Sequence, residues 1–185
     1  MSIASLAGTV VILALSTFIV KLASKIGKKE LSMIGCFISA ASFILLFIIH
    51  THNVLVWVGL IIVATIGTSM FNMVIWAMIT DVIDESEVQT GVRQDGTIYS
   101  VYSFARKLGQ ACSSGLSGVL LSIIGYTSVT AFDPKVVDGI YNITCLVPAG
   151  GMILLLLALW FLYPLNKKRV EENAEKLRIK RNENA

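Results

Sequence analysis

A polar face with a lysine near its middle runs along the apolar segment 97–124. Its members recur at intervals of three and four residues, as on one side of a helix: Ser100, Ser103, Lys107, Gln110, Ser114 and Ser117. Lys107 lies about ten residues into the segment, which corresponds to about 15 Å along a helix. A lysine at that depth of a membrane span indicates that this face lines an aqueous cavity.

No acidic residue within the apolar segments is placed to pair with Lys107. An ammonium near the centre of a bilayer costs about 2.5–3.5 kcal/mol, so we expect its partner to be substrate, water or protein outside this chain. A structural ion pair within a helical bundle is the alternative. Arg106 points about 100° away around the same helix and faces either a neighbouring helix or the cavity edge. A weaker polar line on segment 54–80 adds Asn72 and Trp76, the latter as an interfacial anchor or a stacking surface for a ring.

Acidic residues are crowded between positions 81 and 96, where the apolar pattern stops. Asp81, Asp84 and Glu85 share one face if the preceding helix continues through them, and they meet the negative end of its dipole. Cationic side chains are expected to compensate, with Arg93 close in sequence and Lys25, Lys28 and Lys29 on the same side of the membrane. The pattern predicts a cytoplasmic gate that closes in one conformation and opens in another, formed by Asp81, Asp84, Glu87, Arg93 and Asp95.

The composition places these residues in an all-α membrane protein. The 185 residues are 55% hydrophobic and 15% charged, whereas soluble domains have about a quarter charged residues. About 20 apolar residues span a bilayer as a helix, and unpaired strands are too costly in lipid. We expect five spans, within a membrane domain of residues 1–165, and a charged tail over 166–185. The predicted spans are 3–22, 31–50, 54–80, 97–124 and 139–164.

The distribution of Lys and Arg predicts the orientation. Twelve of the 15 basic residues fall in the first connection, the acidic connection and the tail, which share one side if there are five spans. We therefore expect a multi-pass protein of the cell membrane, with its amino terminus outside and its tail in the cytoplasm.

Enzyme and metal chemistry fit the acidic stretch poorly. The stretch lacks the alternating ligands and glycine of an EF-hand. A membrane prenyltransferase would hold Mg²⁺–diphosphate with two Asp-rich motifs, but the other acidic pair, Asp133 and Asp138, falls on the opposite side. We expect no enzyme activity, no bound metal or cofactor and no nucleic-acid partner.

The stretch "DVIDESEVQTGVRQDGTIYSVYSFARKLGQA" resembles the signature of the glycoside–pentoside–hexuronide:cation symporter family, within the major facilitator superfamily. In that family it joins the tenth and eleventh helices, and "SKIGKKE" resembles the basic loop after the eighth. Glu85 departs from the pattern by replacing the usual tyrosine. The positions that match are Asp81, Asp84, Glu87, Thr90, Gly91, Arg93, Asp95, Gly96 and Lys107.

The resemblance implies the carboxy-terminal part of a transporter with two six-helix bundles around a midplane site. Such proteins couple a small sugar or glycoside to Na⁺ or H⁺, with the cation-binding acids on the amino-terminal bundle. That bundle, upstream or on another chain, is an expected partner. The resemblance places Lys107 and Ser103 at the sugar and cation cavity, and Gln110 on the same face. A non-transporting membrane scaffold and, less well matched, the prenyltransferase stay open as alternatives.

Overall fold

The computed structural model describes residues 18–51 and 53–183. Within these residues all regular structure is helical, and five long helices follow a short helical stretch at 18–26. The long helices are α2 (Lys28–Ile49), α3 (Val54–Thr90), α4 (Asp95–Ile123), α5 (Pro134–Phe161) and α6 (Lys167–Glu183). Four of the five predicted spans coincide with α2 to α5, which confirms the all-α fold class. The other, 3–22, lies largely outside the described residues.

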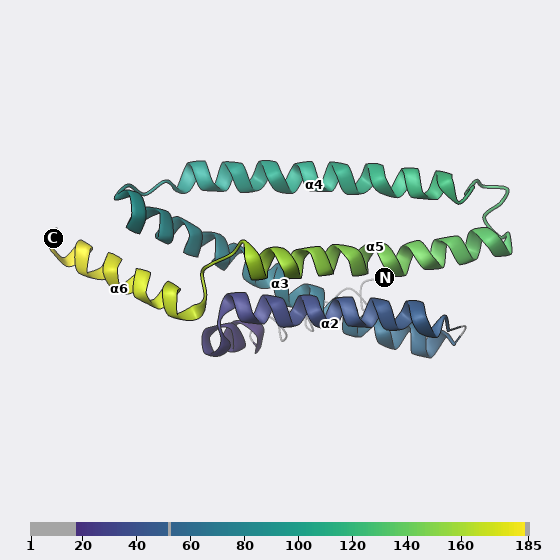
Figure 1. Cartoon of the computed structure of the whole chain (residues 1–185), viewed down its shortest axis with the longest axis horizontal. Helices are drawn as coiled ribbons and strands as arrows, with labels where there is room; N and C mark the ends of the chain where they lie inside the picture. Colours follow the sequence, from purple (N-terminus) through teal and green to yellow (C-terminus); the bar gives the residue numbers. More distant parts are fainter. Residues whose placement is uncertain (1–17, 52, 184–185) are drawn as a thin grey trace, which may run out of the picture.

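The helices α2 to α5 run back and forth along the long axis of the molecule, and α6 extends from the end where α5 stops (Figure 1). The helix α2 packs against both α3 and α5, whereas α4 contacts α3 and lies apart from α2 and α5 (Figure 1). The described structure therefore has a packed group, α2, α3 and α5, with α4 and α6 each contacting α3 at its side.

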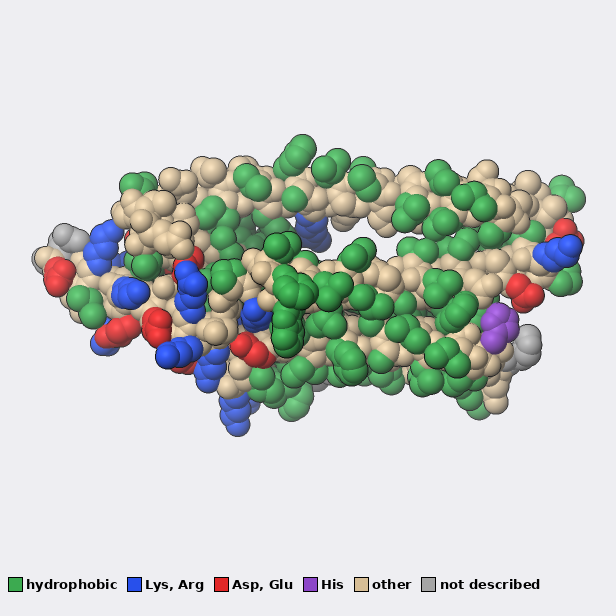
Figure 2. All heavy atoms as spheres, in the orientation of Figure 1, with side chains coloured by type: hydrophobic (Ala, Val, Ile, Leu, Met, Phe, Trp, Pro, Cys, Tyr) green, Lys and Arg blue, Asp and Glu red, His purple; other side chains and the backbone are tan. Residues whose placement is uncertain are grey.

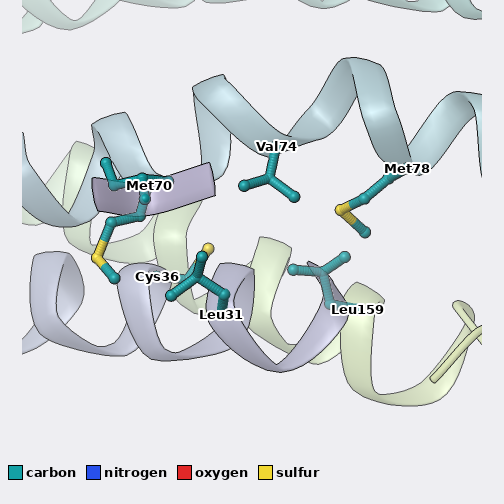
Figure 3. Packing of buried hydrophobic residues seen from close by; sticks show 7 residues of the cluster. Leu31, Cys36, Met70, Val74, Met78 and Leu159 are labelled. Carbon is teal, nitrogen blue, oxygen red and sulfur yellow. The ribbon is translucent and has the colours of Figure 1, made fainter. Parts of the chain in front are cut away.

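The apolar core lies between α2, α3 and α5. Its fully or nearly buried members include Leu31 and Cys36 from α2, Val74 and Met78 from α3, and Leu159 from α5 (Figure 3). Leucine, isoleucine and valine side chains form most of this core, and the flexible Met70 and Met78 fill the spaces between them. The cysteines Cys36 and Cys145 are buried, whereas Cys112 on α4 is exposed, and none of the three forms a disulfide.

Two glycines allow α2 and α3 to approach each other closely. A Cβ atom placed on Gly35 would lie 2.5 Å from the carbonyl oxygen of Gly67, and one on Gly67 would lie 2.5 Å from the carbonyl oxygen of Gly35. One turn away, the hydroxyls of Ser39 and Thr68 lie 3.0 Å apart across the same interface. Because both clashes would involve backbone atoms, only glycine fits at these positions.

The helix α3 is longer than predicted. Its apolar segment was expected to end near residue 80, but the helix continues to Thr90, so all acids from Asp81 to Glu87 lie on it. The connection to α4 is reduced to residues 91–94. Gly91 ends α3 with a positive φ of 77°, and its N–H donates to the carbonyl oxygen of Glu87, a common helix ending that favours glycine.

Three of the described helices, α2, α3 and α5, are long and apolar enough to cross a membrane. At 37 residues, α3 is about 55 Å long, which exceeds the bilayer core of about 30 Å. Its acidic end therefore projects beyond the apolar layer. The helix α4 has 29 residues but is less apolar, because it carries Arg106, Lys107 and several serines.

Candidate functional site

The polar face of α4 is open along its whole length. The helix buries none of its residues, and the hydroxyls of Ser100, Ser114 and Ser117 donate to carbonyl oxygens of α4 itself. Lys107 lies near the middle of the helix and is exposed. Neither Lys107 nor Arg106 forms an ion pair with any acid among the described residues.

A cleft of about 510 Å³ lies between α3 and α4. It brings together three of the predicted cavity residues, Asn72 and Trp76 from α3 and Arg106 from α4. Phe71, Ile75, Tyr102 and Ala105 complete its lining. The other predicted cavity residues, Ser103, Lys107 and Gln110, do not line this cleft and lie on the exposed polar face of α4.

Aromatic rings and one guanidinium form the wall of this cleft. The guanidinium of Arg106 lies 5.6 Å from the centre of the Trp76 ring, within the range of a cation–π contact. Tyr102 meets Trp76 edge-on at 5.4 Å, and Tyr99 stacks on it at 6.4 Å. Arg106 therefore faces the neighbouring helix α3, one of the two orientations that the sequence left open.

Tyr99 and Tyr102 were not among the predicted site residues. The signal was present in the sequence, because Tyr99, Tyr102 and Arg106 recur at intervals of three and four and so share one face of a helix. That face lies beside the polar face of Lys107 and meets Trp76 on α3. Side chains of this kind, flat rings beside polar groups, suit a ligand with both an apolar face and hydrogen-bonding edges.

Arg93 forms ion pairs with three of the predicted gating acids. Its Nη1 lies 2.9 Å from both Asp84 Oδ1 and Glu87 Oε2, and its Nε lies 2.9 Å from Asp95 Oδ2. The hydrogen bonds that Arg93 donates to Glu87, Asp84 and Asp95 raise the pKa of its guanidinium above the usual value. The arginine thereby joins the end of α3 to the start of α4 and offsets acids at the negative end of the α3 dipole.

Asp81 pairs with α2 instead. Its carboxylate is buried, with 5% of the side chain exposed, and its Oδ1 accepts a 2.6 Å hydrogen bond from Lys28 Nζ. Lys29 donates to the backbone oxygen of Tyr163 at 2.5 Å. Burial, followed by the negative charges of Asp81 and Glu30, raises the pKa of the Tyr163 phenol. A lysine of the first connection therefore balances the negative charge of Asp81, as the sequence predicted.

The tail helix α6 docks on the acidic end of α3. Arg169 forms a two-pronged ion pair with Glu85, and Asn173 Nδ2 donates to Glu85 Oε2 at 2.5 Å. Arg181 Nη2 lies 3.5 Å from Glu87 Oε2. Glu85, the position where the sequence departs from the family pattern, is thus the anchor for the tail. The hydrogen bond to Glu85 raises the pKa of the Arg169 guanidinium.

These contacts gather most charges at one end of the molecule. Figure 2 shows Lys, Arg, Asp and Glu side chains crowded around α6 and the neighbouring helix ends, a smaller charged group with a histidine at the opposite end, and many hydrophobic side chains on the visible surface between them. The first connection, the acidic segment and the tail lie together there, as the arrangement of alternating spans required.

A family model described as MFS/sugar transport protein matches residues 1–167. The chain belongs to this family. Members of this family are multi-pass membrane proteins that carry small sugars, so the resemblance to the glycoside–pentoside–hexuronide:cation symporters is confirmed. The family consists of transporters and not of enzymes.

Two curated relatives illustrate the similarity. The chain is 33% identical over 168 residues to a protein of Escherichia coli (strain K12) named glucuronide carrier protein homolog, covering 91% of this chain and 36% of that protein. It is 38% identical over 152 residues to an uncharacterized symporter of Bacillus subtilis (strain 168), covering 82% of this chain and 33% of that protein. The chain therefore spans about a third of the length of these relatives.

Proposed function

We propose that this chain forms the carboxy-terminal part of a secondary transporter that couples uptake of a glycoside, pentoside or hexuronide to Na⁺ or H⁺. The observation that carries the proposal is the open polar face of α4, with Lys107 near its centre and no acidic partner among the described residues. A charge in that position is costly in lipid and is usual beside a water-filled pathway. Family membership supports the same conclusion.

In this proposal an amino-terminal bundle, upstream or on another chain, supplies the other wall of the cavity. Lys107, Ser103 and Gln110 face that bundle across the substrate. Acids on the bundle bind the coupling cation and balance the ammonium of Lys107. Alternating access results from rocking of the two bundles around the site. The amino terminus of the chain lies outside and α6 lies in the cytoplasm, which follows from the distribution of Lys and Arg.

The charged cluster around Arg93 is proposed as the cytoplasmic gate. Arg93 holds Asp84, Glu87 and Asp95, while Lys28 holds Asp81, so the ends of α2, α3 and α4 are tied together. These contacts stabilise the conformation in which the cytoplasmic end is closed. The partly exposed ion pairs of Arg93 each contribute about 0.2–1 kcal/mol, which is enough to bias an equilibrium between two conformations without locking it.

Replacing Asp84 with alanine is expected to open the cytoplasmic end more often. A cysteine introduced at Ser103, with the native cysteines removed, should react with a membrane-impermeant maleimide from the cytoplasmic side about 2- to 5-fold faster, as the loss of about 1 kcal/mol implies. Asp133→Ala, at the opposite end, is the matched control and should leave the rate unchanged. Equal rates in the Asp84 variant and the parent would contradict the gate.

The transport function is tested by uptake of radiolabelled sugars into vesicles, with and without a Na⁺ or proton gradient. The chain alone is compared with the chain completed at its amino end, by its natural upstream segment or by that of the E. coli relative. We expect gradient-driven uptake only by the completed protein. Uptake by the chain alone would show that it suffices without the other bundle, and no uptake by either across a broad sugar panel would favour a membrane scaffold.

A further inference from the structure

The cleft between α3 and α4 contains a positive charge that the described part of the chain does not balance. The guanidinium of Arg106 lies over the Trp76 ring and forms no ion pair with any described acid. Arg106 also donates no hydrogen bond to a described residue, so its N–H groups are available for a ligand. Because an arginine is charged at all physiological pH values, the cleft remains cationic throughout a transport cycle.

The remaining lining fits a sugar ring. Trp76 and Tyr102 offer aromatic surfaces for the C–H face of a pyranose, and Asn72 offers an amide that both donates and accepts hydrogen bonds. The cleft volume of about 510 Å³ lies within the usual range of small-molecule sites. A neutral sugar would satisfy these groups and leave the guanidinium without an anion.

We propose that Arg106 makes this cleft selective for anionic sugars, by pairing with a carboxylate at C6 of a uronic acid or uronide. The planar guanidinium matches a carboxylate through two parallel hydrogen bonds, while the cation–π contact with Trp76 holds the guanidinium in the cleft. The assignment rests on the proposed transport function and is distinct from the role of Lys107, which lies on another face of α4. The name of the E. coli relative, a glucuronide carrier homolog, is consistent with such a ligand.

The test compares sugars that differ only at C6: methyl glucuronide with methyl glucoside, and galacturonate with galactose. Uptake is measured with the completed transporter and its Arg106→Gln variant. We expect the variant to raise the half-saturation concentration for the favoured uronate by about tenfold or more, as the loss of a charge-assisted pair implies, and to leave uptake of the neutral partner unchanged or increased. Arg106→Lys should recover part of the uronate affinity, because it keeps the charge but not the two-pronged geometry.

Arg178→Gln is the matched control, since it removes an exposed arginine from α6 far from the cleft and should change neither sugar. Equal losses for both members of a pair in Arg106→Gln would overturn the proposal and assign Arg106 to structure or to an acid of the other bundle. Unchanged uronate affinity, or transport of neutral sugars alone by the parent, would also overturn it. Uptake of no sugar by the parent would instead overturn the transport function itself.

Discussion

Replacing Lys107 with alanine is expected to reduce gradient-driven sugar uptake by about 10- to 100-fold while the protein still inserts into the membrane. The estimate follows from the loss of a hydrogen bond to a charged group, which contributes about 1.5–3 kcal/mol, at about 1.4 kcal/mol for each factor of ten. Insertion should persist because Lys107 forms no ion pair within the described residues. Removing an ammonium from the middle of α4 also makes the helix more apolar.

The measurement is uptake by the completed transporter in vesicles, normalised to the amount of protein in the membrane. Lys135→Ala provides the matched control, because Lys135 is exposed near the start of α5 and loses the same charge away from the proposed cavity. If the Lys107 variant takes up sugar as fast as the unsubstituted protein, Lys107 is not part of the transport site. A loss of membrane protein, in place of a loss of uptake per molecule, would assign Lys107 a structural role.

Replacing Gly67 with valine is expected to destabilise the bundle strongly. The carbonyl oxygen of Gly35 would lie 2.5 Å from the new Cβ atom, and the backbone nitrogen of Ser39 would lie 2.9 Å from it. Both are backbone atoms, so α2 and α3 must separate to accommodate the side chain. Overpacking of this kind costs about 1–3 kcal/mol, and here it also weakens the hydrogen bond between Ser39 and Thr68.

The measurement is the midpoint of thermal unfolding in detergent, together with the yield of folded protein. Gly59→Val is the control, because Gly59 lies on the same helix and nothing lies within 4 Å of a Cβ placed there. The expected result is a lower midpoint for the Gly67 variant alone. Equal midpoints in the two variants would show that the glycine contact between α2 and α3 contributes little to stability.

The docking of the tail helix α6 depends on Glu85, a residue at which this sequence departs from the family signature. Glu85 stands where the family signature has a tyrosine, and the sequence alone assigned no role to this change. In the structure Glu85 forms an ion pair with Arg169 of α6 and accepts a hydrogen bond from Asn173 of the same helix. The docking could not be predicted, because these residues lie more than 80 positions apart and the tail pattern alone fits a solvated helix equally well.

The sequence by itself determined the helical membrane fold, the family and the crowding of charge at one end. These follow from local properties: runs of about 20 apolar residues satisfy the bilayer, and the acidic signature with Arg93 is contiguous in the chain. The same locality explains why the position of Lys107 near mid-helix could be predicted, since it needs only the rise per residue of a helix.

Only the tertiary structure decided which of these side chains meet. In the structure α3 continues through the acidic residues to Thr90. Asp81 forms an ion pair with Lys28, whereas Asp84, Glu87 and Asp95 form ion pairs with Arg93. The tertiary structure also turned Arg106 toward Trp76, added Tyr102 to the cleft, and stacked Tyr99 on the Trp76 ring. Such pairings depend on how one helix is rotated and shifted against another, which is set by packing at contacts such as Gly35 and Gly67 and not by the periodicity of either helix alone.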